Sequence, residues 1–533
     1  MKKLLFVCIS VILLSSCDLL LELLGGLGGS KAFYARDLTK SSNDPNYFYR
    51  ISANLLAENE YCKVYAETTS GVTEATAKKM ANAYSVIHNK MEAAFGLEFE
   101  VEYTNGSKGV LKTLQYADAY TDGDGKLTIL LLDIKDGYVK GVRDSYVAGY
   151  FSPYDFFSGT YYPYSNKCDM IYIDTYPAVP GDDETNSTLA HELQHLMNFT
   201  TSLNNRLVYE GEEVTDINLM DTWIDEGLAS AAEWIYSNGT HLESRYGWYK
   251  YNGRVDKDGN KLLTGKIDMG NNFFVWDNRD HEASCGNANN NYANCKDTAN
   301  HSQYAILDDY ATVYLFFQWL RIQSNNGQNI YKEIIGSSKG DYMAVTDAAS
   351  ARISSSYNNW GRLLGDWLAA NYINNSGGAY GYKTEISSND ISAHYFPVTG
   401  ANARASLYPG EGVYSRINST YYAPTNSGNI KYSLLTSNNV FTSGSIPSGA
   451  LLTYNINTVN DIDGDFPSPE NGIVTGVAAD VNIAVPAQGR SITAGSYNRP
   501  YRIGAGDVQR GWFRDFPLDG VLQLPNSLTI REE

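Results

Sequence analysis

Hydrophobic residues recur every three to four positions over several stretches of the chain, a pattern that indicates amphipathic or buried helices. Between Ala75 and Phe95 this spacing predicts a helix, and Gly96 is placed to end it. The same pattern predicts further helices over 187–200, 221–237, 304–323 and 343–374. All of these predicted helices lie before residue 375.

Short continuous apolar runs predict buried strands in the same part of the chain. Leu127 to Ile134 reads LTILLLDI, and Met170 to Ile173 reads MIYI. The aromatic, glycine-rich stretch Gly149-Tyr150-Phe151 between them is interpreted as a turn. Residues 31–70 show no clear period. Helices and strands in this order predict an α+β domain over residues 31–375.

The pattern changes near residue 375, where an Asn- and Gly-rich stretch marks a domain boundary. Beyond it, short alternating runs lie between turns rich in Gly, Asn and Pro, which predicts an all-β, sandwich-like domain over 376–533. The expected strands are 430–435, 451–456, 473–477 and 481–485.

Composition and charge exclude two classes of protein. Apolar residues make up 43% of the 533 positions, which is inconsistent with a disordered chain. The net charge of −19 disfavours contact with phosphate backbones, so no nucleic-acid partner is expected. The 42 Tyr residues outnumber the 41 Lys and Arg together, a balance more typical of exported proteins than of cytosolic ones.

The N-terminus has the features of an export signal. Lys2 and Lys3 precede an apolar stretch that is too short to span a bilayer comfortably. The following Leu14-Ser15-Ser16-Cys17 resembles the lipobox of bacterial lipoproteins. That resemblance implies removal of residues 1–16, acylation of Cys17, a flexible tether over 17–30 and a lipid anchor in the bacterial membrane, facing the periplasm or the cell surface. An ordinary signal peptide with an incidental cysteine is the alternative.

Cysteine usage agrees with export. Besides Cys17, the processed chain keeps Cys62, Cys168, Cys285 and Cys295, an even number that allows three pairings. Since Cys285 and Cys295 bracket an Asn-rich loop, the favoured disulfides are 285–295 and 62–168. Unpaired buried thiols are the alternative.

The segment His191-Glu192-Leu193-Gln194-His195 is an HExxH motif within a predicted helix. Residues four apart lie on one helix face, so His191 and His195 can bind one metal ion. Glu192 is placed to take a proton from a water molecule at that metal. A catalytic zinc site also needs a third protein ligand and an open position.

A candidate for the third ligand lies on the next predicted helix. The segment TWIDEGLAS resembles the W-x-N-E-G-x-A segment of gluzincin peptidases, whose Glu is the third zinc ligand. The matching residue is Glu226. The family's usual Asn is replaced here by Asp225, a carboxylate that can still orient an imidazole. Glu233, two helical turns further on, is the reserve candidate for a ligand or for a supporting role.

Five segments together resemble the hyicolysin family of bacterial zinc metallopeptidases over roughly residues 75–375: LTILLLDIKDGYV, AGYFSPYD, DMIYIDTYP, TLAHELQHLMNF and TWIDEGLASAAEWIY. This resemblance implies a zincin-type catalytic domain, with a mixed sheet above the HExxH helix and a helical lower lobe that carries Glu226. It also implies that Met170 to Asp174 borders the cleft and pairs with an extended substrate.

The resemblance implies a metal-assisted hydrolysis of peptide bonds in which one zinc ion is held by His191, His195 and Glu226 and Glu192 is the general base. The developing oxyanion needs a further donor. Tyr310 is the first choice, because the segment YATVYLFF from Tyr310 to Phe317 resembles in spacing the Y-x-x-x-A-x-hydrophobic-hydrophobic pattern of the aminopeptidase branch, with Tyr314 at the Ala position; a core aromatic is its alternative role. Other candidate donors are His241, His281 and His301.

Two further functions compete with a zinc endopeptidase that cleaves protein or peptide substrates. One is a lipid-anchored adhesin or binding lipoprotein built on a peptidase-like fold. The other is an exopeptidase, which is disfavoured because residues 140–185 contain no G-x-M-x-N type motif to anchor a substrate N-terminus. Both zinc ligands of the motif and its Glu are present, which favours an enzyme.

Structural calcium is a weaker expectation. Three Asp–Gly stretches resemble fragments of calcium loops, and none has the complete twelve-residue pattern with its closing Glu. Each is interpreted as a turn, with a bound Ca²⁺ as the alternative. The three stretches are Asp122–Gly125, Asp256–Gly259 and Asp461–Asp465.

Overall fold

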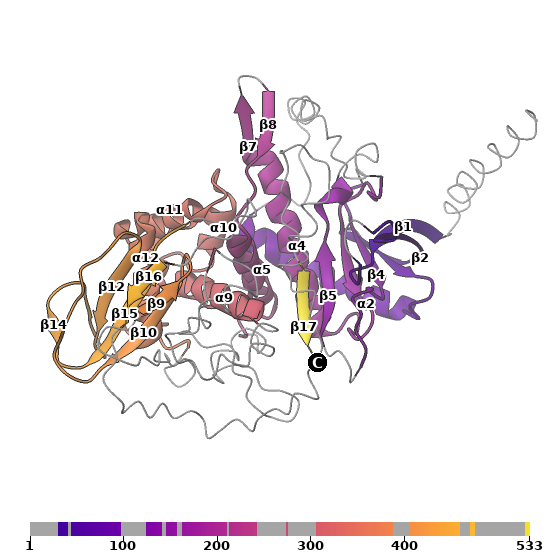
Figure 1. Cartoon of the computed structure of the whole chain (residues 1–533). Helices are drawn as coiled ribbons and strands as arrows, with labels where there is room; N and C mark the ends of the chain where they lie inside the picture. The colour runs from indigo at the N-terminus through magenta and orange to yellow at the C-terminus, as the bar shows by residue number, and fades with distance from the viewer. Residues whose placement is uncertain are drawn as a thin grey trace, which may run out of the picture.

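The fold was analysed in a computed structural model of the chain (Figure 1). The structure describes residues 30–40, 44–96, 124–140, 145–156, 163–210, 213–241, 273–274, 305–386, 404–458, 470–474 and 528–532. The predicted export signal, Cys17 and most of the predicted tether lie outside these residues. Within them, no helix combines the length and the apolar character that crossing a membrane requires.

A seven-stranded mixed sheet forms the frame of the N-terminal part, in the order β1-β2-β3-β4-β6-β5-β17. The pairs β3–β4 and β4–β6 are parallel, and the other pairs are antiparallel. The central strand β4 is buried at every position, as expected for a strand covered on both faces. The strands are β1 (Ser30–Arg36), β2 (Phe48–Glu58), β3 (Cys62–Glu67), β4 (Leu127–Leu132), β5 (Ser145–Phe151), β6 (Met170–Asp174) and β17 (Leu528–Glu532).

Strand β5 corrects two expectations from the sequence. The stretch Gly149-Tyr150-Phe151 is the end of a strand and not a turn. Gly149 is needed there because a Cβ would lie 2.9 Å from the carbonyl oxygen of Tyr172 and 3.0 Å from the Thr188 side chain. In addition, β6 is paired on both sides, by β4 and β5, so Met170 to Asp174 has no edge on which to bind an extended peptide.

The described chain contains seven α-helices, of which α2 and α4 pack against the seven-stranded sheet (Figure 1). Predicted helix 75–95 is confirmed as α2, and Gly96 ends it with a left-handed φ of 68°. The predicted continuous stretch 343–374 is instead divided into two helices. The helices are α2 (Glu74–Phe95), α4 (Asp183–Asn205), α5 (Thr222–Tyr236), α9 (Ala305–Gln323), α10 (Asn329–Ile335), α11 (Tyr342–Arg352) and α12 (Trp360–Ile373).

Helix α4 runs through the middle of the molecule. It begins earlier than predicted, because the Asp182 side chain accepts a hydrogen bond of 2.7 Å from the backbone N–H of Thr185. Every residue from Thr185 to Leu203 is buried. Its apolar side chains share a core with β6, α2 and α5, and its polar side chains must therefore find partners inside the protein.

Beyond residue 404 the described chain is all β. Strands β10-β15-β12-β13 form a four-stranded antiparallel sheet, and predicted strand 430–435 is confirmed as β12. Residues 481–485 lie outside the described part. The strands are β9 (Arg404–Leu407), β10 (Gly412–Ile417), β11 (Tyr421–Tyr422), β12 (Ile430–Leu435), β13 (Val440–Phe441), β14 (Ser445–Ile446), β15 (Gly449–Asn455) and β16 (Glu470–Ile473).

The two parts of the chain meet in one cluster of buried side chains, and the C-terminal strands have a further cluster of their own. Leu452 and Tyr454 of β15 belong to the same cluster of buried side chains as Leu364 of α12, and the hydroxyl of Tyr414 donates to the carbonyl of Leu368 at 2.7 Å. Strand β17 also returns to the N-terminal sheet, where it pairs with β5. The chain changes from helices to strands after the expected boundary near 375, and buried side chains from both sides of it pack together.

Cys62 and Cys168 do not form the predicted disulfide. Both side chains are buried, but Cys62 belongs to the core on the α4 side of the sheet and Cys168 to a second core that contains Phe33 and Tyr150. The sheet thus separates the two sulfur atoms. Cys285 and Cys295 lie outside the described residues.

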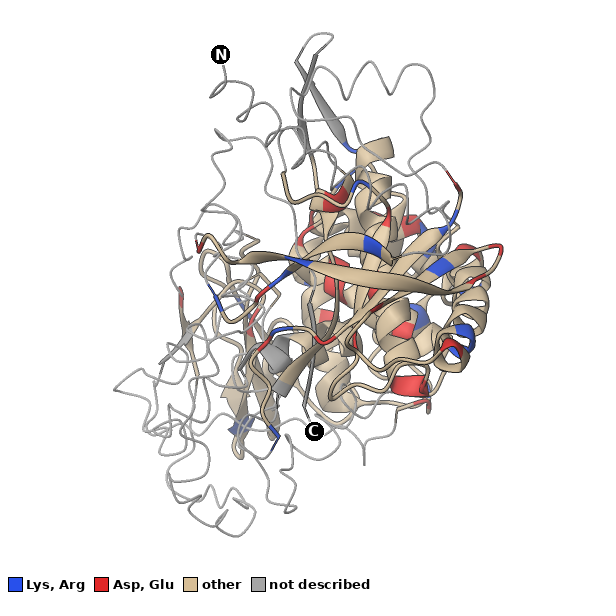
Figure 2. Cartoon of the chain, turned by 90° about the vertical axis from the view of Figure 1, so that its right-hand side faces the viewer, with Lys and Arg blue, Asp and Glu red and all other residues tan. Residues whose placement is uncertain are grey.

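Acidic and basic residues are interspersed along the ribbon on the side of the molecule that Figure 2 shows. Several of them pair, as Lys126 does with Glu58 at 2.6 Å. Asp124, part of the first predicted calcium-like stretch, pairs with Lys63. The other two stretches lie outside the described residues.

Candidate metal centre

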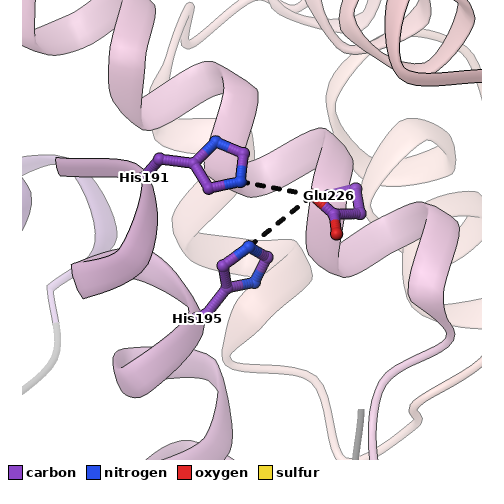
Figure 3. Close-up of side chains that lie close together, drawn as sticks. All are labelled: His191, His195 and Glu226. Atoms are coloured by element: carbon purple, nitrogen blue, oxygen red, sulfur yellow. Dashed lines mark ion pairs between the residues drawn. The ribbon is translucent and has the colours of Figure 1, made fainter. Parts of the chain in front are cut away.

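The two histidines of the HExxH motif and Glu226 converge between α4 and α5 (Figure 3). One ligand atom from each of the three residues lies within 4.8 Å of the others. The Nε2 atom of His191 is 3.3 Å from Oε2 of Glu226, and the Nε2 atom of His195 is 3.6 Å from the same oxygen. This is the group of three that the sequence predicted, and within the described residues it is the one group of its kind.

The chemistry of these three atoms fits a metal ion. All three side chains are at most 2% exposed. Within the described part of the chain, neither Nε2 atom nor Oε2 of Glu226 has a hydrogen-bond partner. Buried polar atoms are rarely left in that state without a ligand, and two imidazoles with one carboxylate are a common donor set for catalytic zinc.

The outer nitrogen of each imidazole faces a carboxylate of α5. Nδ1 of His191 is hydrogen-bonded to Oε1 of Glu233 at 2.8 Å, and Nδ1 of His195 lies 2.8 Å from Oδ2 of Asp225. Such contacts fix the tautomer and leave Nε2 for the metal. Glu233 is thus placed to support His191, and Glu226 is the carboxylate of α5 whose Oε2 faces both Nε2 atoms.

The carboxylates also set the electrostatics of the site. Burial lowers the pKa of His191, but Glu226 and Glu233 outweigh burial, so this pKa lies above its ordinary value. Burial raises the pKa of Glu226, but His195 and His191 outweigh burial and lower it to about 2. A site that stabilises positive charge on the imidazoles in this way also favours a divalent cation between them.

Glu192 is positioned by strand β5. Its side chain is fully buried, and Oε2 accepts a hydrogen bond of 3.0 Å from the backbone N–H of Phe151. The sequence did not predict this contact, because Gly149-Tyr150-Phe151 was interpreted as a turn. Glu192 lies on α4, the helix that carries both histidines, and this contact holds its carboxylate against the end of β5.

Tyr310 is the candidate donor that the structure brings to the site. Its hydroxyl donates to Oε1 of Glu226 at 3.1 Å. His241 instead lies beyond the end of α5, with Nδ1 2.6 Å from the Tyr314 hydroxyl and Nε2 3.4 Å from Glu385. His281 and His301 lie outside the described residues.

A chain of polar side chains behind His195 was not predicted. Oδ1 of Asp225 accepts a hydrogen bond of 2.6 Å from Nδ2 of Asn198, and Oδ1 of Asn198 accepts one of 2.6 Å from Nη2 of Arg206. Burial lowers the pKa of Arg206 to about 10, and the charge of Asp225 opposes that shift. No local sequence pattern links these residues, since the helices bring them together.

Gly227 allows α5 to approach α9 closely next to Glu226. A Cβ at this position would overlap the ring of Phe317, which is fully buried. We expect Gly227→Ala to destabilise the protein by about 1–3 kcal/mol through overpacking. Urea unfolding measures this change, with Ser230→Ala on the same helix as the control. Equal stability of the two variants would show that the ring moves aside without cost.

Comparison with known proteins agrees with this geometry. Over 221 residues the chain is 34% identical to the neutral metalloprotease ShpI of Staphylococcus hyicus, and the aligned part covers 40% of this chain. The chain spans 39% of that relative's length. No family model matches the chain. The similarity supports a metallopeptidase relationship.

Proposed function

We propose that the protein is a zinc-dependent metalloendopeptidase of the hyicolysin family that cleaves protein or peptide substrates. The observation that carries this proposal is the convergence of three buried ligand atoms without hydrogen-bond partners, two of them from histidines that lie within one turn of the buried Glu192 on α4. The similarity to a neutral metalloprotease supports the reaction class.

The residues of the site divide the chemistry among them. Zinc, held by His191, His195 and Glu226, would supply the Lewis acid that polarises the scissile carbonyl and acidifies the attacking water. Glu192 takes a proton from that water and then delivers it to the leaving amine. The backbone N–H of Phe151 holds the Glu192 carboxylate in position for both transfers.

We further propose that Cys17 carries a lipid that anchors the processed chain to a bacterial membrane, on the periplasmic side or at the cell surface. The proposal rests on the lipobox-like Leu14-Ser15-Ser16-Cys17 sequence. Metabolic labelling with a fatty-acid analogue would label the wild type and not Cys17→Ser.

Metal removal tests the cofactor. Dialysis against a chelator is expected to abolish hydrolysis of casein and to lower the melting temperature, because a ligand that binds only the folded state stabilises it by about 4 kcal/mol at a thousand times its Kd. Added Zn²⁺ restores both. Full activity in protein shown by mass spectrometry to be free of metal would exclude the proposed mechanism.

Tyr310 is proposed as the donor to the developing oxyanion. Removal of one such donor costs about 10²–10³-fold in kcat, so Tyr310→Phe should lower kcat by about 10²-fold with little change in zinc affinity. Chelator competition measures the affinity. Loss of zinc affinity with kcat retained at saturating zinc would instead assign the hydroxyl to the support of Glu226.

A further inference from the structure

Asp225, Asn198 and Arg206 form a hydrogen-bonded relay of side chains behind His195, and Asp225 lies at its inner end. The site contains four carboxylates from the two helices, and all are at most 5% exposed: Glu192, Asp225, Glu226 and Glu233. Glu226 faces both imidazoles, and Glu233 receives a hydrogen bond of 3.1 Å from the Ser187 hydroxyl. Asp225 differs from Glu233, because its Oδ1 atom is linked through the side-chain amide of Asn198 to the buried Arg206.

Arg206 is built into this position. It is 2% exposed, and it follows the last residue of α4. Nη1 donates to the carbonyls of Ile335 and Ser337 at 2.9 and 3.1 Å, which fixes the plane of the guanidinium. Nη2 donates to Oδ1 of Asn198 at 2.6 Å. Each of these acceptors is neutral, and a buried charge in such surroundings is stabilised by an opposite charge that it reaches through hydrogen bonds.

The chemistry of the three groups fixes the direction of the relay. A guanidinium has only donors and a carboxylate has only acceptors, so the Asn198 amide must turn Oδ1 to Arg206 and Nδ2 to Asp225. That leaves Oδ2 of Asp225 for Nδ1 of His195, 2.8 Å away. A shift of Asp225 by one rotamer would release the imidazole, whose Nε2 is the metal-binding atom.

We propose that Arg206 is a positioning residue for the metal ligand His195 and acts on it through Asn198 and Asp225. This inference rests on the proposed function of the site as a metal centre. Arg206 and Asn198 hold the Asp225 carboxylate in one orientation, and Asp225 keeps Nε2 of His195 directed at the metal position. The positive charge of Arg206 thereby stabilises the carboxylate of Asp225, the residue that stands where the W-x-N-E-G-x-A segment of gluzincin peptidases has Asn.

The test exchanges the two middle residues of the relay. Asn198→Asp places a second carboxylate against Asp225, so the two groups repel, and zinc affinity is expected to fall about tenfold or more. In the double variant Asn198→Asp/Asp225→Asn, the carboxylate now stands at position 198 and accepts from Arg206. The amide now at position 225 donates to that carboxylate, and its oxygen accepts from His195. All donors again face acceptors, and zinc affinity is expected to return to within about threefold of the wild type.

Zinc affinity is measured by competition with a chromophoric chelator on the full-length protein, without reference to hydrolysis. Thr201→Val, which removes a buried hydrogen bond to Met197 on the same helix, is the matched control and should bind zinc as the wild type does. The melting temperature of each metal-free variant checks the fold. Arg206→Lys keeps the charge but shortens the reach to Asn198, and should weaken zinc binding as Asn198→Asp does.

The outcomes separate this inference from the proposed function. Rescue by the double variant supports the relay even if the wild type does not cleave casein, in which case only the peptidase proposal fails. Wild-type zinc affinity in Asn198→Asp, or additive losses in the double variant, would overturn the relay and leave the peptidase proposal standing. A wild type that binds no zinc overturns both.

Discussion

Glu192→Gln is expected to lower kcat for peptide hydrolysis by about 10³–10⁴-fold, at the upper end of what general acid–base catalysis contributes. The amide has nearly the shape of the carboxylate, and its oxygen still accepts the hydrogen bond from the backbone of Phe151. It cannot, however, take a proton from water. The variant should therefore fold normally and contain wild-type amounts of zinc.

The measurement combines steady-state cleavage of a casein-derived peptide with metal content by mass spectrometry. Glu184→Gln makes the same chemical change at an exposed position in the first turn of α4 and should keep wild-type activity. Hydrolysis that persists in Glu192→Gln at equal metal content would remove Glu192 from the mechanism, whereas a zinc-loaded wild type that cleaves no peptide would favour the competing interpretation as a binding lipoprotein.

Glu226→Gln is expected to weaken zinc binding by more than about 100-fold, beyond the effect of losing a supporting residue. The change removes a negative charge from the only described carboxylate that faces both Nε2 atoms. It leaves the Tyr310 hydroxyl an acceptor, so the packing between α5 and α9 is retained. Activity should fall in parallel at limiting zinc.

Chelator competition on Glu226→Gln and Glu233→Gln decides between the two carboxylates of α5. The geometry predicts the larger loss for Glu226→Gln, because Glu233 contacts the outer nitrogen of His191. The reverse order, with wild-type affinity in Glu226→Gln, would move the ligand role to Glu233.

The candidate site was predictable where its residues belong to a local pattern within a single helix. The spacing of His191 and His195 and the Glu226 segment carry local patterns, and the structure brings those residues together. The residues that hold these side chains in place carry no such local pattern. Phe151 reaches Glu192 from a strand, and Arg206 reaches Asp225 only through Asn198. Contacts of this kind depend on tertiary packing, which leaves no period in the sequence.

Strands were harder to predict than helices for identifiable reasons. β5 is buried on both faces, and its Gly149 serves the close approach of α4, where a turn was expected. β2 carries a β-bulge between Leu55 and Ala57 that breaks its alternation. β3, by contrast, alternates buried and half-buried positions from Cys62 to Glu67. The sequence of β3 carries this alternation, within a segment for which no clear period was predicted.

The pairing of β17 with β5 affects how the protein is made. β5 is synthesised early, and the strand that pairs with its outer edge follows only after all the other described elements. Until then the nascent chain carries an unpaired strand edge next to the helix that holds the metal ligands, and such edges are prone to pair with other chains. The sheet is therefore completed by a contact of very long sequence separation, which slows folding and makes synthesis through β17 a condition for the finished N-terminal sheet.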